Sequence, residues 1–385
     1  MVRAWCLAAT ILLMPLGQAW ADSPERDENA ALKYWQAIAS LPKLKEADIQ
    51  KFNEQNILKP LDEHETEILS KAEYALKLMK QGAALKRCDW GIPYEDGLDV
   101  LLPHMDGARM LTSLACLRAR FLFGAGSNEA AIDDLVAALA LARHVSQGGI
   151  LIETVFGYNL ENKAIEPLLP YLPRLDAKLI KDLKTRLDAL PAVGNPAKAM
   201  ANEELSGLSW FVREVKKTKN KEDLVVLVTP LFAVEHEGKR RDFAEKARAF
   251  VEECGGAKEG VLKLAEEVHP SYELMAKKLD LPLDEFQRAF DQESKRQEKN
   301  PVFKVFFPAM AKVRQAKARA DVRRALLAAA LDVQLSGQDA VKNHTDPVVG
   351  GPFEYAPFDG GFELRSKLKG QNDKPLTLTA GTRSK

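Results

Sequence analysis

The 385-residue sequence is poor in cysteine and carries no net charge. It has 4 Cys, 7% aromatic residues, and 55 Lys and Arg against 55 Asp and Glu. So few cysteines exclude a disulfide-dense scaffold. Balanced charge gives no overall field that would attract nucleic acid or an anionic membrane. With 46% hydrophobic and 29% charged residues, the composition is that of a globular protein that buries a core.

The first 21 residues have the pattern of a secretory signal peptide. Arg3 supplies a short positive start, residues 4–16 are mostly apolar, and residues 19–21 form an A-x-A cleavage pattern. The apolar run is shorter than the roughly 20 residues that a membrane-spanning helix needs. We therefore expect residues 1–21 to be a signal peptide, and the mature protein to be secreted or periplasmic without a transmembrane segment.

Removal of the leader leaves three cysteines, Cys88, Cys116 and Cys254. An odd number cannot pair completely within one chain. A bridge between Cys88 and Cys116 and a set of three reduced thiols both fit the sequence, and we expect no essential disulfide. None of the three has a CxxC partner or zinc-ligand spacing, so we predict no metal and no cofactor.

Apolar residues recur at helical spacing through most of the chain. Proline and glycine divide the pattern into a helical region at 22–190, a linker at 191–196 and a second helical region at 197–335. A short strand-like segment follows at 345–366, and then a flexible basic tail at 367–385. The predicted fold class is all-α, with antiparallel helical hairpins in a solenoid-like or irregular bundle and a small carboxyl-terminal β-hairpin.

The clearest helical pattern lies between residues 106 and 145. Two apolar stripes are separated by a break at 124–126, after which Ser127 offers a helix cap. Helices joined by so short a turn pack antiparallel. The first stripe consists of Met110, Leu114, Leu117 and Phe121. The hairpin resembles a tetratricopeptide unit, whose pattern of small and large residues is matched by Ala119, Leu122, Gly126, Ala131, Leu135 and Ala138.

The carboxyl-terminal segment alternates apolar and polar residues on both sides of a turn at 357–361. This alternation predicts a two-stranded hairpin whose aromatic face lies on the helical body. The order Asp346-Pro347-x-x-Gly-x-Pro-Phe-x-Tyr, followed by Gly-Phe-x-Leu-x-Ser366, resembles the closing segment of uncharacterised secreted proteins of planctomycete-type bacteria. It is more distantly similar to the final hairpin of type II secretion pseudopilins. The resemblance implies export and no particular activity.

Residues 306–335 form one long predicted helix with a basic first half. At about 100° per residue, its basic side chains wrap around the helix. Lys312, Arg319 and Arg323 share one side, whereas Arg314, Lys317 and Arg324 lie elsewhere. This distribution favours a solvated surface over a dedicated anion site.

Motifs for catalysis are scarce, and the catalytic residues of any enzyme activity stay unknown. The sequence has no Gly-x-Ser-x-Gly element and no phosphate-binding glycine loop. His64 with Glu67, or His236 with Glu237, would be the ligands of a metal-assisted hydrolase, but neither segment has the second histidine of a His-Glu-x-x-His motif.

Glu153 interrupts an apolar run at 149–156. If this face packs inward, the carboxylate needs a basic partner such as Arg120, Arg143 or His144. A buried structural ion pair is the favoured interpretation. A carboxylate that contacts a ligand in a groove is the alternative, and these four residues are then the candidate ligand site.

Together these patterns predict an exported helical binding or structural protein. Its partner would be another protein or a component of the cell envelope, and not nucleic acid. The alternatives are an exported hydrolase, possibly metal-assisted, and an accessory component of a secretion apparatus, which rests on the terminal hairpin alone.

Overall fold

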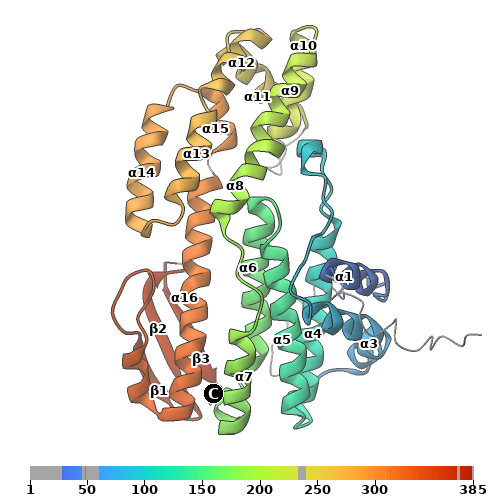
Figure 1. The fold of residues 1–385 in the computed structure, drawn as a ribbon, viewed down its shortest axis with the longest axis vertical. Helices are drawn as coiled ribbons and strands as arrows, with labels where there is room; N and C mark the ends of the chain where they lie inside the picture. The colour runs from blue at the N-terminus through green and yellow to red at the C-terminus, as the bar shows by residue number, and fades with distance from the viewer. Residues whose placement is uncertain are drawn as a thin grey trace, which may run out of the picture.

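The computed structural model describes residues 28–45, 48, 60–232, 240–307, 309–370 and 373–383. Helices dominate these ranges, and a small antiparallel sheet lies near the carboxyl terminus (Figure 1). The predicted fold class is therefore confirmed. In the described ranges, every helix is too short or too polar to cross a bilayer. The predicted signal peptide lies outside the described residues.

The described residues of the first helical region form six α-helices, built around the predicted hairpin. The helices are α1 (Ala30–Ala39), α3 (Glu63–Ala83), α4 (Pro103–Gly124), α5 (Asn128–Ser146), α6 (Leu151–Ile165) and α7 (Ala177–Asp188). Asp62 and Glu65 form a capping box that fixes the start of α3. Between α3 and α4, the loop carries a short 3₁₀ segment, η1 (Tyr94–Asp99).

The hairpin of α4 and α5 differs from the prediction in two details. Gly126 has φ +78°, and the Ser127 N–H donates to the Leu122 carbonyl at 2.8 Å, which closes the end of α4 in a Schellman motif. Ser127 occupies the N-cap position of α5, but its side chain makes no capping hydrogen bond. Phe121, expected on the buried stripe, is 46% exposed.

The second helical region consists of shorter helices. They are α8 (Pro196–Glu204), α9 (Trp210–Lys217), α10 (Lys221–Val228), α11 (Arg240–Glu253), α12 (Lys258–Glu266), α13 (His269–Lys278), α14 (Leu283–Arg296) and α15 (Pro301–Phe306). Asn195 caps α8 by accepting the Ala197 N–H at 2.8 Å, which explains why the predicted linker ends there.

The long helix α16 (Ala309–Ser336) joins the two regions (Figure 1). Met310 and Val313, near its start, belong to the hydrophobic cluster of the second region. From Val322 to Val333, its buried residues belong to the cluster of the first region, together with the sheet. The predicted assignment of residues 197–335 to one separate helical region therefore does not hold for α16, which contributes to both cores.

The sheet has three antiparallel strands in the order β1 (Glu354–Phe358), β2 (Gly361–Lys369) and β3 (Pro375–Gly381). Phe362 and Leu364 are buried in the core cluster that contains α16, which confirms the predicted apolar face. The prediction of a flexible tail is wrong for β3, where Leu376, Leu378 and Ala380 are also buried. Their alternation with exposed or half-buried residues is that of a half-buried strand.

Asp346, the first residue of the carboxyl-terminal motif, anchors the segment that leads into the sheet. Its carboxylate is 3% exposed and accepts the Val348 and Val349 N–H groups at 2.9 and 3.1 Å. The Ser366 hydroxyl on β2 donates to the other carboxylate oxygen. The first and last residues of the motif therefore hold the loop against the sheet, which is a structural role.

Candidate functional site

Glu153 lies in the first turn of α6 and is completely buried. Its carboxylate accepts the Ile150 N–H at 3.0 Å and the Tyr94 hydroxyl at 2.9 Å. His104 Nε2 lies 2.8 Å from Glu153 Oε1, close enough for an ion pair although the geometry is not that of a hydrogen bond. No side-chain surface of Glu153 reaches solvent, and its partners come from η1, α4 and the N-cap of α6, so the carboxylate belongs to a polar cluster inside the fold.

The basic partners expected for Glu153 lie elsewhere. Arg143 Nε donates to Glu161 at 3.0 Å, and His144 Nδ1 shares a 2.9 Å hydrogen bond with the Tyr34 hydroxyl. Burial lowers the pKa of Arg120, with the charge of Glu65 opposing that shift. The candidate ligand site of Glu153, Arg120, Arg143 and His144 is therefore wrong as a set, since its members serve separate contacts in the helical core.

Aromatic rings surround the buried histidines. Trp90 stacks on His104 with ring centroids 4.7 Å apart, and Tyr34 stacks on Trp90 at 5.6 Å. Burial lowers the pKa of His144 to about 4, and burial together with the Glu153 charge raises that of Tyr94. The uncharged form of His144 is thus the native one at neutral pH.

The residues considered for a metal-assisted hydrolase do not converge in the described part of the chain. His64 contacts Asp48 at 2.9 Å, whereas Glu67 pairs with Lys71 on the exposed side of α3. His236 and Glu237 lie outside the described residues. In the described ranges, no three His, Cys, Asp or Glu side chains are close enough to hold a metal ion. Cys88, Cys116 and Cys254 are thiols, and burial raises the pKa of each to about 12.

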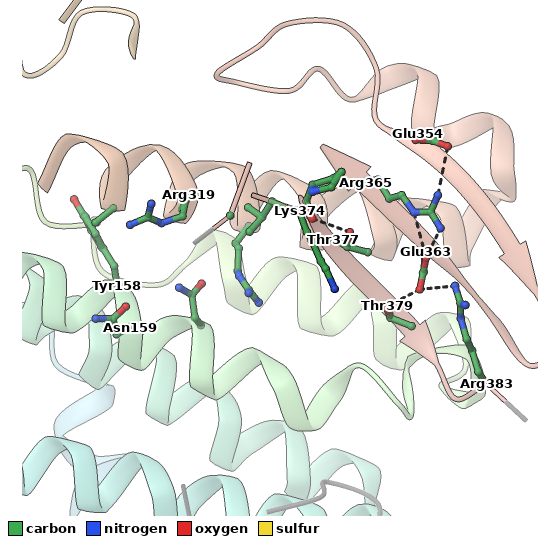
Figure 2. Close-up of a pocket in the computed structure, with 16 residues that line it drawn as sticks. Tyr158, Asn159, Arg319, Glu354, Glu363, Arg365, Lys374, Thr377, Thr379 and Arg383 are labelled. Carbon is green, nitrogen blue, oxygen red and sulfur yellow. Dashed lines mark hydrogen bonds and ion pairs between the residues drawn. The ribbon is translucent and has the colours of Figure 1, made fainter. Parts of the chain in front are cut away.

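A polar cleft of about 910 Å³ lies between α6, α16 and the sheet (Figure 2). Its volume is at the upper end of the range for small-molecule sites, roughly 300–1,000 Å³. Most of the side chains that line it are charged or hydrogen-bonding: Asn159, Asn162, Arg319, Arg323, Glu354, Glu363, Arg365, Lys374, Thr377, Thr379 and Arg383.

The polar face of the sheet forms one wall of this cleft, because side chains alternate between the two faces of each strand. The same period of two that buries Leu364 and Leu378 turns Glu363, Arg365 and Thr377 toward the opposite face of the sheet. Glu354, Arg365 and Thr377 are partners across the three strands, and Glu363 pairs in register with Thr379. Cross-strand pairing therefore brings residues that are far apart in the sequence into two polar rows.

The helices supply the other walls. Arg319 and Arg323 are one turn apart on α16, and Asn159 and Asn162 are one turn apart on α6. The interpretation of the basic half of α16 as a solvated surface needs correction here. Arg314 is buried and donates to the Leu281 carbonyl at 2.8 Å, and Arg324 pairs with Glu161 at 2.6 Å, so the basic residues divide between structural contacts and the cleft.

Two ends of the cleft differ in how their charges are paired. At the sheet end, Glu363 binds Arg365 at 2.8 Å and Arg383 at 2.6 Å. Burial alone would raise the pKa of Glu363, but these guanidinium groups hold it below its usual value. In the described structure, Arg319, Arg323 and Lys374 form neither an ion pair nor a side-chain hydrogen bond. The Arg323 charge does act on the Glu166 carboxylate and opposes the rise in its pKa that burial causes.

Figure 2 shows this separation along the cleft. Arg319 lies with Tyr158 and Asn159 near one end, and Glu363 lies with Arg383 near the other. Burial lowers the pKa of Arg319, and no carboxylate contributes an opposing shift. A guanidinium that loses water without gaining an ion-pair partner is suited to bind an anion from outside the protein.

No protein-family model, no curated protein and no solved structure matches the chain. The cleft is therefore the feature from which a function can be proposed.

Proposed function

We propose that the protein is an exported binding protein, secreted or periplasmic, that holds an anionic ligand in the cleft between α6, α16 and the sheet. The observation that carries this proposal is the set of three cations, Arg319, Arg323 and Lys374, that face the cleft without an ion-pair partner among the described residues. Export is supported by the signal-peptide pattern of residues 1–21.

The arrangement of the cations supports anion binding more than general solubility. Surface charges that serve solubility are well hydrated and are commonly paired along their own helix, as Arg288 is with Asp284 on α14. Arg319 and Arg323 instead project from one helix toward a concave surface that two other elements complete. Guanidinium groups bind carboxylates and phosphates through two parallel hydrogen bonds, which gives direction as well as attraction.

The experiment compares anion binding by two double variants of equal charge. Calorimetric titration of the purified protein with citrate, tripolyphosphate, triglutamate and acidic trisaccharides identifies the anion that binds best. The R319Q/R323Q variant is expected to weaken that binding by at least about 10-fold, the effect of losing one charge-assisted hydrogen bond. The R288Q/K295Q variant removes the same charge from the exposed face of α14 and is expected to bind normally.

Two results would contradict the proposal for the cleft. One is the absence of binding for every anion, and the other is an equal loss of affinity in both double variants, which would indicate a nonspecific charge effect. Export is tested separately by fusing residues 1–21 to a phosphatase that is active only outside the cytoplasm. Loss of reporter activity on deletion of residues 4–16 is expected, and an inactive intact fusion would refute export.

A further inference from the structure

The two ends of the cleft differ in how many of their charges are paired, and this difference limits the class of anion that fits. The inference rests on the proposed function. The α16 end offers Arg319 and Arg323 with no carboxylate paired to them in the described structure. At the sheet end, the carboxylates of Glu363 and Glu354 together balance the charges of Arg365 and Arg383. A ligand that matches both ends carries its negative charge at one end only.

A uniformly charged polymer fits this cleft poorly. The Glu354 carboxylate lines the sheet end and is 69% exposed, and its nearest cation, Arg365, is 3.6 Å away. A phosphate or carboxylate on every unit of a polymer would place like charge beside Glu354 and Glu363. Ionised carboxylates accept hydrogen bonds and donate none, so the ligand must present O–H or N–H groups to this end.

The rows on the sheet match hydroxyl groups. Glu354, Arg365 and Thr377 stand side by side across the three strands. Glu354 is an acceptor, Arg365 is a donor, and the Thr377 hydroxyl, which donates to the Pro375 carbonyl at 3.1 Å, can accept a further hydrogen bond. Directly opposed residues on neighbouring strands are about 5 Å apart. Sugar hydroxyls donate and accept at similarly close spacing, whereas a peptide would need apolar recesses for its side chains and this lining is mainly polar.

We propose that the ligand is a short oligosaccharide with one acidic group, a carboxylate or a phosphate, at one end. The acidic group binds Arg319 and Arg323 on α16, and Lys374, which directly precedes β3, is the third unpaired cation that lines the same cleft. The uncharged sugars extend over the polar face of the sheet, where their hydroxyls bind Glu354, Arg365 and Thr377. The cleft volume of about 910 Å³ exceeds the need of a single sugar and suits several.

The test titrates the purified protein with matched trisaccharides. Trisaccharides of glucose, galactose and N-acetylglucosamine are each used in three forms: uncharged, with a terminal carboxylate and with a terminal phosphate. Triglutamate serves as the uniformly acidic peptide. At least one acidic trisaccharide is expected to bind about 10-fold more tightly than both its uncharged parent and triglutamate. Comparison of the carboxylate and phosphate forms distinguishes the two acidic groups.

Variants at the two ends provide the second readout. Arg319→Gln is expected to reduce the affinity for the acidic trisaccharide toward that for its uncharged parent. Glu354→Gln and Thr377→Val are expected to weaken both forms by the same factor, about 3- to 10-fold, because they act on the sugar part. Both positions are on the open side of the sheet, so the fold can be checked by circular dichroism.

The outcomes separate this inference from the proposed function. If triglutamate binds as tightly as the best acidic trisaccharide, the ligand is an acidic peptide, and the oligosaccharide inference fails while anion binding stands. If uncharged and acidic trisaccharides bind equally, the division of the cleft is wrong. If no anion binds at all, both proposals fail.

Discussion

Two carboxylates, Glu153 and Glu363, show how differently the protein uses charge in its core and at its cleft. Glu153 is completely buried, and its contacts with Tyr94, His104 and the Ile150 N–H lie inside the fold. Glu363 retains 12% of its side-chain exposure and faces a cleft lined by five basic and two acidic side chains. The comparison separates charge that holds the protein together from charge that is available to a ligand.

The difference follows from the balance between partners and water. In the core, a buried carboxylate without partners has a large desolvation cost, and His104 and Tyr94 both contact the Glu153 carboxylate. At the cleft, residual hydration tolerates an excess of cations, and that excess is what an anionic ligand can neutralise. Substitutions at the two places should therefore separate stability from binding.

The largest effect is expected at Glu153. Glu153→Gln disrupts the buried group that accepts hydrogen bonds from Tyr94 and the Ile150 N–H and lies beside His104, and each buried polar group left unsatisfied typically lowers the free energy of unfolding by about 1–3 kcal/mol. Urea denaturation at pH 7 measures the change. Glu354→Gln, on the exposed strand, is the control and should change stability by less than about 0.5 kcal/mol. Equal stabilities for the two variants would contradict a structural role of the Glu153 charge.

The second effect is a pH dependence that belongs to the core. Burial lowers the pKa of His144 from 6.5 to about 4, so below pH 6.5 the unfolded chain takes up a proton that the folded chain does not. Stability from this group is complete above pH 6.5 and falls by on the order of 3 kcal/mol as the pH drops to 4.

Denaturation series from pH 7 to pH 4 compare the native protein with two variants. In His144→Asn, this part of the acid destabilisation should be absent. In His64→Asn, which alters a side chain that is 54% exposed, the loss of stability that His144 causes between pH 6.5 and pH 4 should remain. Parallel curves for all three proteins would show that His144 titrates normally.

The smallest change in stability, less than about 1 kcal/mol, is expected for Glu363→Gln. The substitution frees Arg365 and Arg383 from their shared carboxylate, so the affinity for small anions should rise by a few-fold in calorimetric titration. Because the pKa of Glu363 is lowered in the folded protein, its contribution to stability is present above pH 4.5 and is lost on further acidification. A decrease in anion affinity would show that Glu363 itself contacts the ligand.

The sequence predicted the elements whose signals are local. The stripes on both sides of 124–126 predicted α4 and α5, and the alternation around 357–361 predicted β1 and β2. Strand β3 was missed because its alternating Leu376, Leu378 and Ala380 occur in a stretch read as a basic tail. A strand this short gains its stability by pairing with β2, which a local pattern does not reveal.

The site was less predictable than the fold because it depends on contacts between distant segments. Because Glu153 lies within an apolar run, the sequence indicated that its side chain is buried. No local pattern identified His104 and Tyr94 as its partners. The cleft combines α6, α16 and the sheet, and helical periodicity shows only that Arg319 and Arg323 share a side. Whether that side meets solvent or a concave wall is decided by tertiary packing.

The position of α16 has a consequence for the order in which the chain can fold. The cluster that starts with Ala30 in α1 ends with Ala380 in β3. During synthesis, α6 and α7 therefore emerge from the ribosome before α16, against which they pack in the folded protein. Such long-range closure slows folding and leaves the nascent chain prone to aggregation. The hydrophobic cluster that includes Ala30 is therefore complete only after β3 has been synthesised and has paired with β2.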